Sequence, residues 1–246
     1  DHNFERKLNL LGTFYIKTGT PEQAIELYER NLNSENMTES LCISYAEALE
    51  MEEKYSEAEK KYLDALEKNP NSSVAFKRYF DIVKKRSNLE YESKLEKLSS
   101  IKGNWRAKVM EAVVFFKCGN REMGNFYLMS ALKESSYNSE VMSLTSSIYI
   151  LNQMYEEFEK YVLPYYTPEK HVQTTLNVLE YYYSKRKYNE GLELCKFVSK
   201  YPWIEYYRKF MKLEEKFLKL KIKKTESRNK NEKNKLLPKN KFFSTN

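Results

Sequence analysis

The sequence predicts an all-α protein, an α-solenoid of about six antiparallel helix pairs closed by one further helix. Gly and Pro occur only six times each in 246 residues, too rarely for a turn-rich β protein. Apolar residues recur at helical spacing in short stretches that end at Gly or Pro. A pattern of small and aromatic residues also returns at a nearly constant interval, which indicates repeated helix pairs.

The first unit, Phe4 to Leu32, shows how a pair begins and ends. Gly19 is predicted to end the first helix in the left-handed conformation that glycine adopts readily. Thr20 is predicted as the N-cap of the second helix, with Pro21 at its first position and Gln23 completing a capping box.

The second unit ends at Asn69-Pro70 and carries two apolar stripes at helical spacing. They consist of Tyr45, Ala46 and Leu49, and of Tyr55, Ala58, Tyr62 and Ala65. Two short amphipathic helices cannot bury both faces by themselves, so the unit is predicted to stack against neighbours.

Two series of residues keep one register along the chain. Ala24 and Ala58 are 34 residues apart, and small residues are needed where two helices cross closely. The first series continues through Gly124, Phe158 and Gly191, at intervals of 66, 34 and 33 residues. The second series runs through Tyr28, Tyr62, Leu128, Val162 and Cys195. Two independent series with one spacing make a chance match a poor explanation.

The later units vary this pattern. The second helix of the third unit carries Leu89, Tyr91, Leu95 and Leu98 on its apolar face. Tyr91 occupies the crossing position, which predicts looser packing there. The fourth unit breaks at Gly119-Asn120, and Pro164 ends the fifth. Thr167 is predicted to cap the next helix, with Pro168 as its first residue. The sixth unit closes at Pro202.

The C-terminal part divides into a capping helix at 203–224 and a basic tail at 225–246. The helix has an apolar stripe to cover the last pair and lysines on its outside. The whole chain has a net charge of +7. From Lys219 onward ten Lys and Arg face two Glu, so the preceding residues are near neutral, at −1. The tail is polar and aperiodic and is predicted to be disordered.

Over residues 4–202 the chain resembles the tetratricopeptide repeat (TPR) family, through the 34-residue register and the paired small and aromatic positions. The resemblance implies a right-handed superhelix over 1–202, whose first helices line a concave groove that binds peptides or protein segments. By repeat register the groove contacts are Asn9, Thr13, Lys17, Glu47, Lys77, Asp81, Lys84, Val109, Val113, Phe116, Lys117, Ser147, Glu180 and Tyr183.

The sequence holds no catalytic or metal-binding constellation. His2 and His171 have no nucleophile or acid at motif spacing, and no HExxH, GxSxG or phosphate-binding glycine loop occurs. Cys42, Cys118 and Cys195 are far apart and are interpreted as buried free thiols. We therefore expect no enzyme activity, cofactor, metal or small-molecule substrate.

The predicted function is that of a cytoplasmic, non-enzymatic scaffold for a protein or peptide ligand. No run of 18 apolar residues is present, and the chain, which opens at Asp1, is interpreted as a processed or truncated piece. The alternative is a helical-repeat module that engages nucleic acid or an anionic membrane surface through its basic tail. The tail then provides a weak contact for an anionic partner.

Overall fold

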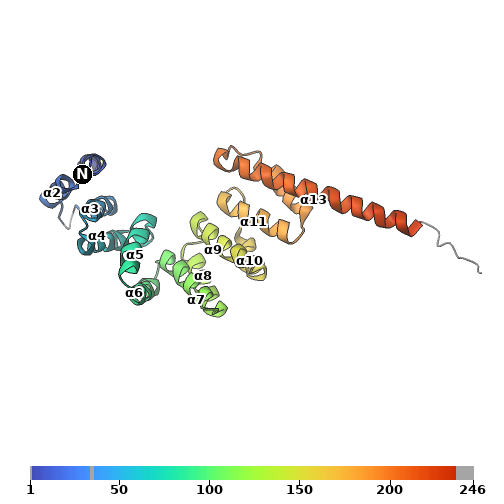
Figure 1. Cartoon of the computed structure of the whole chain (residues 1–246), viewed down its shortest axis with the longest axis horizontal. Coiled ribbons are helices and arrows are strands. Elements are labelled where there is room, and N and C mark those ends of the chain that lie inside the picture. The colour runs from blue at the N-terminus through green and yellow to red at the C-terminus, as the bar shows by residue number, and fades with distance from the viewer. Residues whose placement is uncertain (1, 34–35, 237–246) are drawn as a thin grey trace, which may run out of the picture. The chain divides into compact units, whose positions relative to one another are not determined.

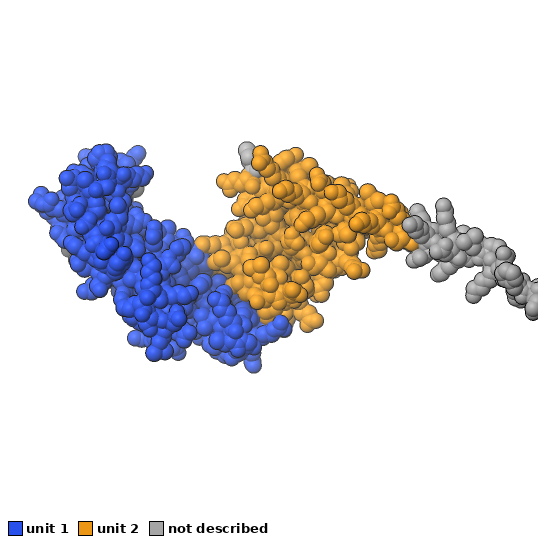
Figure 2. All heavy atoms as spheres, in the orientation of Figure 1, with its two compact units in different colours: residues 1–137 blue, residues 138–246 orange. Residues whose placement is uncertain are grey.

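The computed structural model describes residues 2–33 and 36–236. The described residues form α-helices and one short 3-10 helix, and they contain no strand (Figure 1). They belong to two compact units, residues 1–137 and residues 138–246 (Figure 2). The predicted boundaries at 202 and 224 do not coincide with this division and remain predictions about role.

The described residues of unit 1 form eight helices, and those of unit 2 form the others. The helices of unit 1 are α1 (His2–Lys17), α2 (Pro21–Asn31), α3 (Glu39–Met51), α4 (Tyr55–Lys68), α5 (Ser73–Arg86), α6 (Asn88–Ser100), α7 (Trp105–Lys117) and α8 (Arg121–Glu134). Those of unit 2 are α9 (Ser139–Leu151), α10 (Tyr155–Tyr161), the 3-10 helix η1 (Leu163–Tyr165), α11 (Val172–Ser184), α12 (Tyr188–Val198) and α13 (Ile204–Leu236).

Successive helices pack as antiparallel pairs, and each pair contacts the next within its unit. In unit 1, α1 packs on α2, α3 on α4, α5 on α6, and α7 on α8, while α1, α2, α4 and α6 also contact helices of the following pair. In unit 2, α9 packs on α10 and α11, and α12 packs on α11 and α13. The predicted all-α fold of stacked helix pairs with a C-terminal capping helix is confirmed.

The residues of the predicted register lie at the same point in the second helix of five pairs. Ala24, Ala58, Gly124, Phe158 and Gly191 are each the fourth residue of their helix and are buried. Three of them, Ala24, Ala58 and Phe158, are 0% exposed. The recurrence of small residues therefore marks close helix contacts, as side-chain bulk at a crossing requires.

Aromatic rings fill the space that the glycines leave. A Cβ atom built on Gly124 would lie 2.5 Å from the ring of Phe116, and one on Gly191 would lie 2.4 Å from the ring of Phe217. Real Cβ atoms do not approach ring carbons so closely, so any larger residue at either position must displace an aromatic side chain.

We expect Ala58→Leu to lower the free energy of unfolding by about 1–3 kcal/mol, because it overpacks a crossing that has no spare volume. Urea denaturation followed by circular dichroism measures the change. Ser56→Leu on the exposed side of the same helix is the control and should leave stability nearly unchanged. Equal midpoints for the two variants would contradict the register.

The second helix of the third pair departs from the others. Tyr91 is half-buried and packs edge-on against Phe80, with ring centroids 5.0 Å apart at 69°. Leu95 is fully buried, but Leu89 is 78% exposed, so its assignment to the apolar face was wrong. Helix α6 therefore contributes to the core from Tyr91 onward.

Two predicted helix starts were also wrong in detail. Thr20 occupies the N-cap of α2, but its hydroxyl donates to the carbonyl of Tyr15 at 3.2 Å and makes no cap bond. Helix α11 begins at Val172 with His171 at its N-cap, not at Thr167. The Thr167 amide instead donates to Nδ1 of His171 at 3.0 Å, which closes a turn before the helix.

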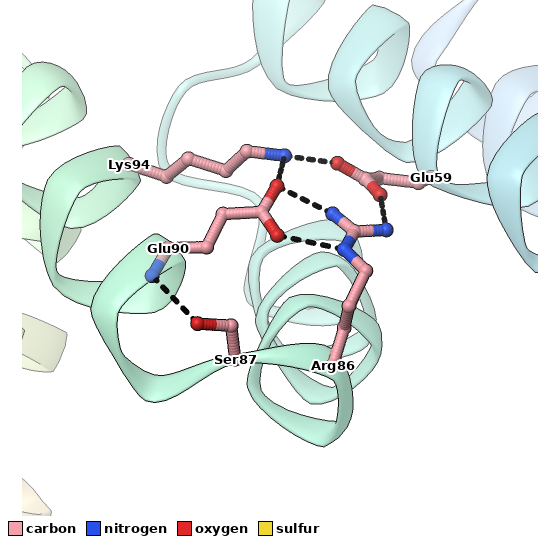
Figure 3. A network of polar contacts seen from close by, with 5 residues as sticks. All are labelled: Glu59, Arg86, Ser87, Glu90 and Lys94. Atoms are coloured by element: carbon pink, nitrogen blue, oxygen red, sulfur yellow. Dashed lines mark hydrogen bonds and ion pairs between the residues drawn. The ribbon is translucent and has the colours of Figure 1, made fainter.

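A network of alternating charges ties α4 to α5 and α6 (Figure 3). Arg86 donates to Glu59 at 2.8 Å and grips Glu90 through Nε and Nη2 at 2.7 and 2.5 Å. Lys94 pairs with Glu90 at 2.9 Å and also with Glu59. Ser87, the residue between α5 and α6, caps α6 by accepting from the Glu90 amide at 3.3 Å.

These contacts make stability depend on pH. Hydrogen bonds from Arg86 and then Lys94 lower the pKa of Glu90 to about 2. Burial opposes ionisation of Glu59, but bonds from Arg86 and Lys94 outweigh it and lower the pKa of this carboxyl. Unfolded glutamates titrate near 4.3, so the network's contribution is complete above that pH and is lost as pH falls towards the folded values.

We therefore expect the midpoint of urea unfolding to drop on acidification from about pH 5 to about pH 2 more steeply in the wild type than in Glu59→Gln/Glu90→Gln. The difference between the two proteins isolates this network from other carboxylates. If the midpoint fell equally in the two proteins over this pH range, the paired carboxylates would add no pH-dependent stability.

The C-terminal region differs from expectation in one respect. Helix α13 continues to Leu236, so residues 225–236 are helical where disorder was predicted. Lys and Glu have good helix propensity, and extension of a packed helix avoids the cost of nucleation. The rest of the predicted tail, residues 237–246, lies outside the described residues.

Candidate functional site

The candidate site is formed by the predicted groove residues of α1, α3 and α5, which we call the first-helix face. Its members are Asn9, Thr13, Lys17, Glu47, Lys77, Asp81 and Lys84. All belong to unit 1 and come from the first helices of three consecutive pairs.

Polar side chains hold the first helices of unit 1 side by side. The Asn9 amide donates to Ser40 Oγ at 2.7 Å and accepts from Ser44 Oγ at 3.2 Å, which joins α1 to α3. Arg78 approaches Glu50 at 3.9 Å and joins α5 to α3. Asn9 is therefore a positioning residue between helices as well as a predicted contact.

An open hollow of about 610 Å³ runs along α1. Its lining includes Asn9, Thr13 and Lys17, together with the apolar side chains of Leu10 and Phe14. Leu10 is 64% exposed and Phe14 is 58% exposed, although both are large and apolar. Such a contiguous apolar strip bordered by polar groups is typical of interaction surfaces.

The charges on α3 and α5 are partly satisfied within the protein. Lys77 pairs with Asp81 at 2.5 Å, and both side chains remain exposed. Lys84 lies over the ring of Tyr91 at 5.6 Å, so it is drawn towards the second helix of its own pair. Burial raises the pKa of Glu47, while Arg78 opposes this shift.

The predicted contacts on α7 are less accessible than expected. Val109 is only 3% exposed, so it belongs to the core and is corrected as a groove contact. Phe116 is half-buried, with its ring against Gly124 of α8. Val113 is half-buried and Lys117 is exposed, so these two remain open to a ligand. Helical register identifies a face but not which neighbour covers it.

The predicted contacts of unit 2 lie on α9 and α11, which pack together. The Asn177 amide donates to Ser146 Oγ at 2.6 Å and to Ser147 Oγ at 3.0 Å, so Ser147 already has a partner. Tyr183 packs edge-on against Phe217 of α13, with ring centroids 6.0 Å apart. Glu180 is half-buried. Tyr183 is thus partly covered by the capping helix.

Sequence reasoning missed a cavity of about 580 Å³ between α6, α7 and the start of α8. One of its polar lining residues is Glu111, which is only 8% exposed. Glu111 stands in register with Leu11, Tyr45 and Tyr79 of the earlier pairs, where the chain has apolar or aromatic residues. A charged residue at an apolar position of the repeat was the signal that identifies this site.

Other kinds of site are not found in the part of the chain that the structure describes. No group of three or more His, Cys, Asp or Glu there can hold a metal ion, and no described helix is long and apolar enough to cross a membrane. Cys42 and Cys195 are buried, and burial raises their pKa values to about 11 and about 12. Cys118 is exposed, so the expectation of three buried thiols was wrong.

The stacked helix pairs define the chain as a helical-repeat protein. No protein-family model matches the chain, and no curated protein matches it in sequence. Among solved structures, the chain is similar to one titled a functional characterisation of PilF from Pseudomonas aeruginosa. The two share 14% sequence identity with a TM-score of 0.44, over 84% of this chain and 96% of that one. The helical-repeat assignment rests on the helix pairs themselves.

Proposed function

We propose that the protein is a non-enzymatic scaffold of the TPR type that holds a peptide or protein segment on its first-helix face. The observation that carries this proposal is the hollow along α1, where Leu10 and Phe14 are exposed beside Thr13 and Lys17. Exposing large apolar side chains costs free energy unless a partner covers them, and a nearby cation adds specificity for an acidic group.

The arrangement of the first helices supports the same proposal. Asn9 fixes α1 against α3, so a ligand meets a preorganised surface and pays less entropy on binding. Lys17 is exposed and has no carboxylate partner among the described side chains. We infer that the preferred segment combines an apolar side chain for Leu10 and Phe14 with an acidic residue for Lys17.

Selection from a random peptide library displayed on phage, followed by calorimetry, tests this function. We expect the selected peptides to lose about tenfold or more in affinity for Thr13→Arg and for Lys17→Glu. Lys60→Glu on the exposed side of α4 is the matched control and should bind as the wild type does. Peptides that bind all four proteins equally would remove the first-helix face as the site.

The basic end of α13 favours the second candidate function, contact with nucleic acid or an anionic membrane. Its described lysines include Lys219, Lys221, Lys223 and Lys224, on a helix that extends well past the packed part. Deleting residues 225–246, which carry six further Lys and Arg, should strongly weaken salt-sensitive binding to duplex DNA or phosphatidylserine vesicles if this function holds. The peptides selected above should still bind the deleted protein. The cytoplasmic location remains a prediction.

A further inference from the structure

The cavity between α6 and α7 combines acidic groups with apolar walls. Glu92 and Glu96 project from α6, and Glu111 lies opposite on α7. Leu89, Val114 and Phe115 provide apolar surface around the same space of about 580 Å³. The first-helix face does not include any of these residues, so the cavity is a separate feature of unit 1.

Glu111 is unusual because it is buried without adequate compensation. Its side chain is 8% exposed, and its Oε2 atom has no hydrogen-bond partner. A buried carboxylate normally has an ion-pair partner or several donors, since desolvation of an unpaired charge is costly. The two other carboxylates of the cavity carry the same sign and increase this cost. Burial, then Glu96 and Glu92, raise the pKa of Glu111.

The buried and half-buried lysines of α6 and α7 are engaged elsewhere. Lys94 pairs with Glu59 and Glu90 in the network that ties α4 to α6. Lys108 pairs with Glu134 at 3.1 Å and donates to the carbonyl of Ile101 at 2.7 Å. Among the described residues, no cation lies within ion-pair distance of Glu111. A positively charged ligand could therefore act as its counter-ion.

The cavity lies beside the irregular second helix of the third pair. The other second helices of unit 1 carry Ala or Gly at the crossing position, whereas α6 carries Tyr91. A bulky side chain at a crossing increases the distance between helix axes. Leu89, near the start of α6, remains 78% exposed at the rim of the cavity.

The residues that line the cavity favour an organic cation over a metal ion. The three carboxylates do not form a metal-binding group, and no such group occurs in residues 2–33 and 36–236. Leu89, Val114 and Phe115 instead offer contacts for an aliphatic stem. A planar guanidinium group donates in a fork that suits several carboxylate oxygens, and its weak hydration lowers the cost of burial.

We propose that this cavity binds the guanidinium group of an arginine side chain, supplied by a partner peptide, with Glu111 as its buried counter-charge. The aliphatic part of the arginine lies against Leu89, Val114 and Phe115, and the rim acids Glu92 and Glu96 attract the cation. This inference does not require the first-helix face to be occupied, and it adds a requirement for a basic residue in the partner.

The test uses the full chain and a short, capped, fluorescent peptide with one arginine flanked by leucines. We expect it to bind at least about tenfold more tightly than the same peptide with citrulline, which keeps the shape and removes the charge. Glu111→Gln should abolish this preference, whereas Glu67→Gln, an exposed acid on α4, should retain it. Glu92→Gln/Glu96→Gln should weaken binding less, and mainly at low salt.

Loss of fold does not confuse the result, because Glu111→Gln removes an unpaired buried charge and should unfold at the same or a higher temperature. Equal affinity for the arginine and citrulline peptides, or an unchanged preference in Glu111→Gln, overturns the proposal. Butylguanidinium alone is the second probe. If it binds in a Glu111-dependent manner while the peptide does not, the ligand is a free organic cation and the proposal of a peptide arginine is wrong.

Discussion

Replacing Phe158 with alanine is expected to lower the free energy of unfolding by about 3–5 kcal/mol, among the largest effects of any single substitution in this chain. Phe158 is 0% exposed and occupies the crossing position of α10, where four other pairs have Ala or Gly. Its ring stacks on Tyr181 of α11, with centroids 5.1 Å apart at 27°. Truncation leaves a cavity between a short helix and its neighbour, which α10 has few other contacts to close.

Urea denaturation measured by circular dichroism provides the comparison. Because the protein has two compact units, the transition of unit 2 should shift alone if the units unfold separately. Phe126→Ala removes the same ring from a position that is 62% exposed and should cost far less. A loss of stability no greater than that of Phe126→Ala would mean that Phe158 is not a core residue.

Phe217→Ala is expected to have an effect of similar size, about 3–5 kcal/mol, because it removes the ring that fixes α13 on α12. Phe217 is 0% exposed, and its ring lies where Gly191 leaves α12 without a side chain. It also meets Tyr183 edge-on. The capping helix should therefore detach at a lower denaturant concentration than in the wild type.

Leu218→Ala, one residue away and 46% exposed, is the control for this helix and should be nearly neutral. A double-mutant cycle gives a second check. Gly191→Ala should destabilise the wild type, since its Cβ would meet the Phe217 ring, but should cost less in a Phe217→Leu background. Additive effects would contradict direct packing between the two residues.

The repeat architecture could be predicted from the sequence because it depends on local spacing. Ala24, Ala58 and Gly191 mark crossings by their size alone, and the structure buries each of them. Aromatic residues at the crossings, Tyr91 and Phe158, gave no such signal. Their outcomes depend on neighbouring helices: Phe158 is buried against Tyr181, whereas Tyr91 remains half-buried.

The candidate site was less predictable, since accessibility is set by contacts between distant residues. Repeat register placed Thr13 and Lys17 on the first-helix face, and both line the hollow along α1. The same register placed Val109 in the groove, but tertiary packing buries it. Glu111 was overlooked because its missing partner can only be recognised once the lysines around it are seen to be engaged elsewhere.

Ser87 limits how far α5 and α6 can move relative to each other. It is the single residue between α5 and α6, and Arg86 and Glu90 clasp each other across it. Because the junction is one residue long and an ion pair spans it, α6 has little freedom to tilt relative to α5. We therefore expect the two helices to move as one rigid pair.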